Sequence, residues 1–212
     1  MNKIAVFGAS GRTGKLFTEL ALKSGNEVKA LVRDPSKFGM QHSNLQVIQG
    51  DTADPIKVEE TIRGTEAVID LIGPGKGSSP ELQRTSTRNI LHAMGQNHVK
   101  RLILLASLPF GILDPNDKPT FMNRFMMFMA KNLMGTMVQD AKEHIDLIKQ
   151  REMDWTVVRA PMLSDQSSQG PYRVGYLNES MGKSASRSDV AVFILDVLMN
   201  DKYVKQMPLI SS

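Results

Sequence analysis

Residues 3–14 read Lys3-Ile4-Ala5-Val6-Phe7-Gly8-Ala9-Ser10-Gly11-Arg12-Thr13-Gly14, and this stretch decides the fold. The run before Gly8 is β-prone, and the three glycines permit a tight turn, close approach of backbone N–H groups to a phosphate and close helix packing. An apolar stripe over residues 15–23 predicts a helix, and residues 27–32 predict a second strand. This order predicts a dinucleotide-binding unit with the diphosphate at the helix N-terminus; the alternative is a turn without a ligand. The cofactor-binding residues expected here are Gly8, Ser10, Gly11, Arg12, Thr13 and Gly14.

The end of the second predicted strand indicates which dinucleotide is bound. A carboxylate there would bind the ribose hydroxyls of NAD, whereas an arginine would bind the 2′-phosphate of NADP. The sequence continues Arg33-Asp34-Pro35-Ser36-Lys37, so Arg33, Lys37 and Arg12 can converge on one phosphate. We therefore expect NADP(H) to be preferred over NAD(H). The alternative is that Asp34 turns toward the ribose and Arg33 is a solvated cation.

The composition is typical of a single α/β domain. The 212 residues are 41% hydrophobic and 23% charged, which suffices for one complete core. The net charge is +4, but the basic residues are scattered and form no long run, so no nucleic-acid partner is expected. A generally basic surface also suits an anionic cofactor.

Several residue types exclude other chemistries. The chain has no cysteine, which rules out disulfide bonds and thiol catalysis. None of the four histidines has an acidic or histidine partner at metal-ligand spacing, so no metal site is expected. Neither a signal peptide nor an apolar run long enough to span a bilayer is present, and we expect a cytoplasmic protein without a membrane partner.

Strand and helix patterns alternate along the rest of the chain. Further strands are predicted at residues 45–49, 66–72, 101–106, 155–159 and 207–210, the last at a sheet edge. Helices are predicted at 55–63, at 79–97 after the cap Ser79, and from the capping box Ser186-x-x-Asp189 to about residue 200. The alternation predicts one Rossmann-type domain over residues 1–212, a doubly wound, mainly parallel sheet of about seven strands with helices on both faces.

The ligand of an open parallel sheet lies outside the carboxyl ends of the strands, so residues after each strand form the expected site. Asp51 can accept a hydrogen bond from the adenine amino group, or it only forms a turn. Gly73 leaves room for the adenosine ribose, or it is an ordinary loop glycine. Pro161, Met162 and Leu163 would line the nicotinamide with backbone and apolar surface. Beyond the residues named above, the site drawn from the loops 50–52, 71–75 and 160–163 and from the fifth strand comprises Asp51, Thr52, Leu71, Ile72, Gly73, Ser107, Pro161, Met162 and Leu163.

Segments along nearly the whole chain resemble one family. They are residues 6–14, 31–34, 50–51, 67–69, 88–90 and 186–191. Together they resemble the atypical short-chain dehydrogenases of the biliverdin-IXβ reductase/flavin reductase (NADPH) type and bacterial NADH-flavin-reductase-like, NmrA-like proteins. The resemblance implies an NAD(P)-binding Rossmann domain that reduces a flavin or related acceptor. Residues 110–138 depart from this resemblance, because the segment is longer than in the mammalian enzyme of the family and far richer in methionine and phenylalanine.

The acid that most short-chain dehydrogenases use to protonate a substrate oxygen is absent. None of Tyr172, Tyr176 and Tyr203 precedes a lysine by four positions. We therefore expect an acceptor that takes hydride at one atom and a proton from solvent at another, as FMN and other flavins, linear tetrapyrroles and quinones do. Ser107 is a candidate to hydrogen-bond the acceptor or the nicotinamide amide, or is a loop cap. Lys142 is a candidate to reach the nicotinamide ribose, or is a surface lysine.

Residues 121–137 hold six of the 14 methionines together with three phenylalanines. Such a soft apolar surface suits flat ligands and can form a lid over the acceptor; a helix buried against its neighbour and a dimer face are the alternatives. Lys183 and Arg187 can meet a phosphate or carboxylate of the acceptor, or are solvated.

Two functions are consistent with these patterns. The first, which the resemblance favours, is an NADPH-dependent reductase of flavins or related conjugated acceptors. The second is an NADP(H)-binding redox sensor, similar to the NmrA-like sensors, that acts without turnover through a protein partner. Folding of residues 121–137 over the nicotinamide would fit the reductase, and their exposure would fit the sensor. Either function is compatible with a monomer or a homodimer.

Overall fold

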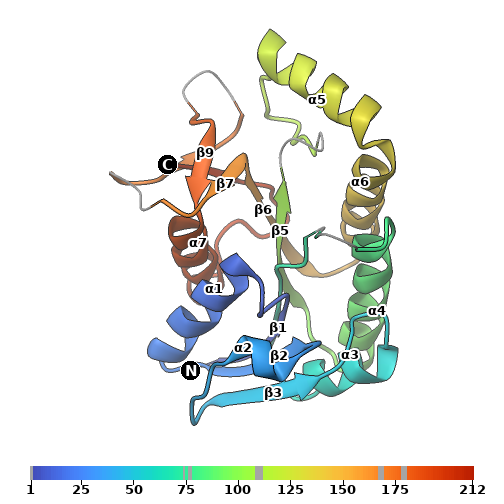
Figure 1. Cartoon of the computed structure of the whole chain (residues 1–212), viewed down its shortest axis with the longest axis vertical. Helices are drawn as coiled ribbons and strands as arrows, with labels where there is room; N and C mark the ends of the chain where they lie inside the picture. Colours follow the sequence, from blue (N-terminus) through green and yellow to red (C-terminus); the bar gives the residue numbers. More distant parts are fainter. Residues whose placement is uncertain (1, 74, 76–77, 108–111, 167–169, 178–180) are drawn as a thin grey trace.

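The computed structural model describes residues 2–73, 75, 78–107, 112–166, 170–177 and 181–212. Its main sheet has the order β3-β2-β1-β4-β5-β6-β10-β8, and every neighbouring pair is parallel except β10–β8 (Figure 1). The strands are β1 (Lys3–Phe7), β2 (Glu27–Val32), β3 (Leu45–Gln49), β4 (Ala67–Asp70), β5 (Arg101–Ser107), β6 (Asp154–Ala160), β8 (Arg173–Gly175) and β10 (Leu209–Ser211). A separate pair joins β7 (Met162–Ser164) and β9 (Ser184–Ser186).

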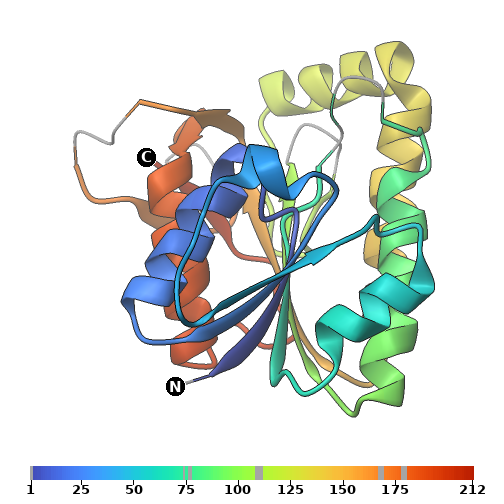
Figure 2. The ribbon, with the colours of Figure 1, turned by 60° about the horizontal axis from the view of Figure 1, so that its bottom comes forward.

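Helices cover both faces of this sheet. Figure 2 shows α1 (Arg12–Lys23) and α7 (Arg187–Met199) on one face and α3 (Pro55–Ile62), α4 (Leu82–Gln96) and α6 (Gly135–Lys149) on the other. The short α2 (Pro35–Phe38) follows β2, and α5 (Phe121–Leu133) precedes α6. The predicted doubly wound Rossmann-type fold is therefore confirmed.

The strands supply two cores because successive side chains point to opposite faces of a sheet. Ile4 and Val6 of β1 pack in one core with Phe17 of α1 and Phe193 of α7. Phe7 of the same strand belongs to the other core, which α3, α4 and α6 cover. A parallel sheet covered in this way leaves its carboxyl edge as the accessible place for a ligand.

Two predicted element positions are wrong. The strand at the chain end is not an edge strand, because the three-residue β8 pairs with its outer side, and a strand that short has no readable period. The helix expected from Ser79 begins at Leu82, because the Ser79 hydroxyl accepts from the Glu81 N–H and closes a turn before it. The capping box at α7 is half formed: Ser186 accepts from the Asp189 N–H at 3.2 Å.

The methionine-rich segment forms α5 and the start of α6. No residue of α5 is buried, so the alternative of a helix buried against its neighbour is wrong for α5. Figure 1 shows α5 at the end of the molecule toward which β5 runs. Residues 110 and 111, which the prediction included, lie outside the described residues.

Candidate cofactor site

A cleft of about 270 Å³ lies at the carboxyl ends of β1, β2, β3 and β4. Leu31, Val32, Ser78 and Leu82 line it and were not predicted; the first two end β2, so the strand-end rule could have found them. Ser78 directly precedes the helix predicted at residues 79–97 and Leu82 lies within it, but no sequence motif assigned that helix a ligand-binding role. Nine of the predicted residues line the same cleft, namely Gly8, Ser10, Gly11, Arg33, Asp51, Thr52, Leu71, Ile72 and Gly73.

The glycine turn has the shape that a diphosphate requires. Gly8 has φ +76°, and a Cβ on it would lie 2.7 Å from the Leu71 carbonyl carbon. A Cβ on Gly14 would lie 2.1 Å from the Gly8 oxygen, so α1 packs directly against the turn. Within the described part of the chain no side chain caps α1, whose first residues follow Gly11. The unpaired N–H groups of this helix end fit an anionic diphosphate.

Arg33 and Asp34 have different surroundings. Arg33 is exposed and lines the cleft. Asp34 accepts from the Ser36 N–H at 3.1 Å and pairs with Lys37 at 3.2 Å. The hydrogen bond from the Ser36 side chain, followed by that from Lys37, lowers the pKa of Asp34. Asp34 is thus engaged by its own helix, which argues against the alternative that it binds the ribose.

Arg12 does not reach the cleft. Its guanidinium pairs with Asp165 at 2.8 Å, and the same carboxylate accepts from Arg187 at 2.7 Å. Of the three cations expected to converge on one phosphate, Arg33 alone lines the cleft as far as the described residues go. A contact from Arg12 or Lys37 therefore stays a prediction that requires each to leave its present carboxylate. Thr13 and Gly14 are buried in the first turn of α1.

Asp51 and Thr52 are positioned from two sides. Asp51 accepts from the Ala53 N–H at 2.9 Å, the contact of a turn-forming residue. The Thr52 hydroxyl lies 2.6 Å from that of Ser86, and its carbonyl accepts from Asn89 at 2.8 Å. These contacts connect the loop after β3 to α4 and hold the cleft wall. The adenine contact of Asp51 stays a prediction.

Asp70 is a carboxyl group that sequence reasoning missed. It ends β4, is 3% exposed, and accepts from the N–H of Ile72, which lines the cleft, at 3.0 Å. Burial raises the pKa of Asp70 to about 7, against the smaller opposite effect of that hydrogen bond. Because its pKa is raised, this carboxyl adds less negative charge beneath a site for an anionic cofactor than an exposed aspartate would at neutral pH. The sequence feature that could have indicated this buried carboxyl is a single polar residue within the apolar run 67–72.

The residues predicted around the nicotinamide share one edge but do not line the cleft. Ser107 pairs in register with Ala160, so the following Pro161, Met162 and Leu163 lie next to the end of β5. Pro161 is buried and Met162 is exposed; the Ser107 side chain lies outside what the structure describes. Lys142 is exposed on α6 and is not part of the cleft lining. Their roles stay predictions.

A buried ion pair supports the segment before α5. The Arg159 guanidinium and the Asp117 carboxylate are 0% and 1% exposed and pair through both carboxylate oxygens. Burial alone would raise the pKa of Asp117, but Arg159 and the N–H groups of Asp114 and Leu177 outweigh it and lower that pKa. Sequence reasoning missed this pair, although an arginine within an apolar strand signals a buried partner.

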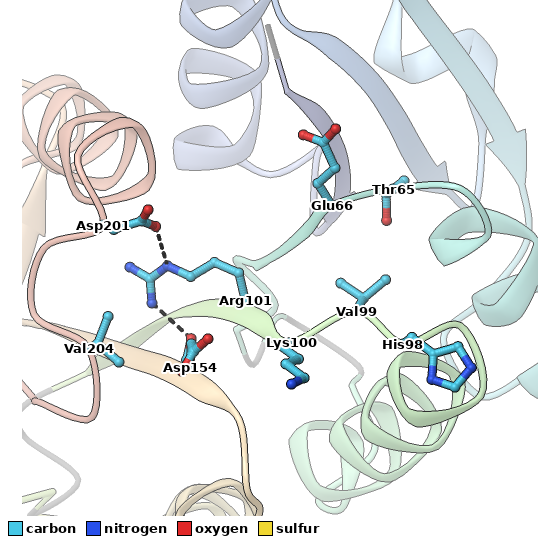
Figure 3. Close-up of a pocket in the computed structure, with 9 residues that line it drawn as sticks. All are labelled: Thr65, Glu66, His98, Val99, Lys100, Arg101, Asp154, Asp201 and Val204. Atoms are coloured by element: carbon cyan, nitrogen blue, oxygen red, sulfur yellow. Dashed lines mark hydrogen bonds and ion pairs between the residues drawn. The ribbon is translucent and has the colours of Figure 1, made fainter.

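A second depression, of about 670 Å³, lies at the opposite end, by the amino ends of β4, β5 and β6 (Figure 3). Arg101 in its wall donates to the carbonyl oxygens of Asp154 at 2.9 Å, Val197 at 3.3 Å and Lys202 at 3.1 Å. Its Nε faces Asp201 at 3.7 Å. Since this guanidinium is occupied in joining β5 to β6 and to the end of α7, we assign it a structural role.

The cleft, the glycine turn and the topology together agree with a family model. Residues 8–201 match the model of the family described as NAD(P)H-binding. The chain belongs to the NAD(P)H-binding family. This membership covers most of the domain and confirms a nicotinamide dinucleotide as the class of ligand.

Three relatives extend the comparison. The chain is 26% identical over 156 residues to the oxidoreductase aflX of Aspergillus parasiticus. This alignment covers 67% of the chain and 59% of aflX. ChuY of Escherichia coli O157:H7, an anaerobillin reductase, superposes with a TM-score of 0.77 at 21% identity, covering 99% of the chain and 96% of ChuY. A short-chain dehydrogenase/reductase of Veillonella parvula in complex with NADP has a TM-score of 0.77 at 17% identity, covering 100% and 94%. The two solved structures show that the fold is shared.

Two kinds of feature are absent from the residues that the structure describes. None of their helices is long and apolar enough to cross a membrane. No group of three or more His, Asp and Glu among them is placed to hold a metal ion.

Proposed function

We propose that the protein is an NADPH-dependent reductase that passes hydride to a flavin or a similar conjugated acceptor. The observation that carries the cofactor choice is the placement of Arg33 in the cleft while Ser36 and Lys37 hold Asp34. A planar guanidinium at this strand end suits a 2′-phosphate, and a free carboxylate would suit ribose hydroxyls instead. The names of aflX and ChuY, an oxidoreductase and a reductase, support the reaction class.

The bound dinucleotide supplies the hydride, and the chain contributes binding and orientation. The N-terminus of α1 holds the diphosphate, and Asp51 and Gly73 position the adenosine half. Pro161, Met162 and Leu163 line one face of the nicotinamide and leave the other to the acceptor. Without the tyrosine–lysine pair, the acceptor takes its proton from solvent, so the rate depends on proximity and orientation. Ser107 orients the acceptor or the nicotinamide amide.

One observation favours the second candidate, an NADP(H)-binding sensor without turnover. The sensor hypothesis expects the methionine-rich segment to be exposed, and α5 has no buried residue. The reductase hypothesis is compatible with this arrangement if α5 closes over the acceptor after the cofactor binds.

Turnover distinguishes the two candidates. Oxidation of NADPH and NADH by the full chain is followed at 340 nm under anaerobic conditions, with FMN, riboflavin, biliverdin and a quinone offered in turn. We expect NADPH-selective turnover with at least one acceptor. Tight NADPH binding with no turnover above the enzyme-free rate for any acceptor would refute the reductase and support the sensor.

A further inference from the structure

The outer surface of α5 carries several large apolar side chains that the fold leaves exposed. Exposed fractions reach 83% for Phe121, 76% for Leu133 and 62% for Phe128. A contiguous exposed apolar patch on one helix marks an interaction site in a soluble domain. The side chains that form this outward face are Phe121, Met122, Phe125, Met126, Phe128 and Leu133.

The inner side of α5 is separate from this face. Asn123, Met127 and Ala130 are its half-buried residues, and spacings of four and three place them on one side of a helix. Met127 packs against Leu177 and Leu209 in a small cluster. At about 100° per residue, the three phenylalanines and Met122 lie on the opposite arc and so point away from the domain, whereas Met126 and Leu133 lie at its border.

The helix is firmly connected at its start. Thr120 and Asn123 form a capping box, with the Thr120 hydroxyl accepting from the Asn123 N–H at 3.2 Å. The Lys118 N–H donates to the Leu177 carbonyl at 2.7 Å, next to the buried Arg159–Asp117 pair. The outward face is therefore presented by an anchored helix.

The charges around the outward face all have one sign. Between Lys118 and Gln139 the chain has three cations, Lys118, Arg124 and Lys131, and no aspartate or glutamate. Arg124 and Lys131 are seven residues apart and lie along the same edge of the helix. An apolar helix face flanked by cations is the composition that binds at an anionic lipid interface.

A second copy of the chain fits this face less well. In a twofold antiparallel pairing of α5 centred between Met127 and Phe128, Arg124 of one copy would lie opposite Lys131 of the other. No carboxylate of the patch would compensate that repulsion. Anionic lipid headgroups would instead neutralise both cations.

We propose that the outward face of α5 docks on an anionic lipid surface, its phenylalanine, methionine and leucine side chains entering the headgroup region and Arg124 and Lys131 contacting lipid phosphates. The sequence-based expectation of no membrane partner concerned a spanning segment and did not anticipate a helix lying on the surface. Because α5 lies at the carboxyl end of the sheet, docking brings the cofactor end of the molecule to the bilayer (Figure 1).

The test is flotation of the full chain with vesicles of phosphatidylcholine, with and without about one third phosphatidylglycerol. We expect binding to the anionic vesicles that weakens with added salt, and little binding to the neutral ones. Arg124→Glu/Lys131→Glu should lower the affinity about tenfold or more, and Phe125→Ser/Phe128→Ser should lower it comparably. Binding of NADPH by each variant, with its circular dichroism, confirms that the domain is folded.

The matched controls lie away from α5. Lys149→Glu/Arg151→Glu replaces two exposed cations at the far end of α6, and Ile56→Ser removes a side chain that is 73% exposed on α3; both variants should bind vesicles as the wild type does. Absence of flotation with the anionic vesicles at low salt would overturn the proposal, as would equal binding by the α5 and control variants. So would a stable dimer in sedimentation that Phe125→Ser/Phe128→Ser dissociates, since α5 would then be covered by a second copy.

Discussion

Replacement of Asp70 by asparagine should change how the stability of the domain depends on pH. Burial raises the pKa of Asp70 to about 7, whereas an aspartate in an unfolded chain titrates near 3.9. Between these values the folded state holds a proton that the unfolded state lacks, so the free energy of unfolding falls as pH rises. At about 1.4 kcal/mol per unit over about three units, the loss from pH 4 to pH 7 is roughly 4 kcal/mol. The side-chain amide introduced by Asp70→Asn would not titrate, and its oxygen would still accept from the Ile72 N–H.

Urea unfolding of the cofactor-free protein at about pH 4, 5.5, 7 and 8, followed by circular dichroism, measures this effect. The stability of Asp70→Asn relative to the wild type should rise by roughly 4 kcal/mol between pH 4 and 7 and then level off. His144 acts in the opposite direction: burial lowers its pKa to about 4, so its own contribution falls as pH drops from about 6.5 to 4. The two slopes partly cancel in the wild type, and Asp70→Asn should expose the one from His144. A difference between variant and wild type that stays constant from pH 4 to 8 would refute the reasoning.

Three further substitutions test the cofactor site and its support. Arg33→Asp should weaken NADPH binding by about 2 kcal/mol more than NADH binding in titration calorimetry, with Arg63→Asp as control; equal losses would remove the phosphate assignment. Gly14→Ala should lower the melting temperature and abolish NADPH binding, because its Cβ would lie 2.1 Å from a carbonyl oxygen of the turn. Gly95→Ala is the control: it lies in a helix, its Cβ would have no neighbouring atom within 4 Å, and it should add about 0.5–1 kcal/mol of stability. Asp117→Asn should cost about 3–5 kcal/mol in urea unfolding at pH 7, because it leaves a buried guanidinium without its charge partner; a loss below about 1 kcal/mol would contradict this account.

Much of the cofactor cleft could be predicted because one rule of topology applies at several strands. Parallel strands end at the same edge, so Arg33, Asp51 and Gly73 come together although they lie far apart in sequence. The pairing of Arg12 with a carboxylate could not be predicted, for a definite reason. Its partner Asp165 is 153 residues away, and no local pattern reports a contact over such a separation. The pair of Arg159 and Asp117 escaped prediction for the same reason.

The orientation of α5 escaped prediction for a different reason. An amphipathic pattern shows that a helix has an apolar face but not what that face contacts. The same sequence pattern is expected whether the helix packs on the domain, in a dimer or on a lipid surface. What separates these cases is which residues the fold covers, and in α5 only Asn123, Met127 and Ala130 are partly covered.

The electrostatics of the two ends of the sheet support the smaller cleft as the candidate cofactor site. At the carboxyl end, the glycine turn presents the N-terminus of α1, and Arg33 adds a cation. At the amino end, Arg101 lines the larger depression, but its guanidinium already donates to the carbonyl oxygens of Val197, in the last turn of α7, and Lys202. Glu66, Asp154 and Asp201 line that depression together with Lys100 and Arg101, so it presents no net positive charge to a dinucleotide phosphate. The electrostatics therefore favour the end of the sheet that the strand-end rule predicts, whereas volume alone would favour the other.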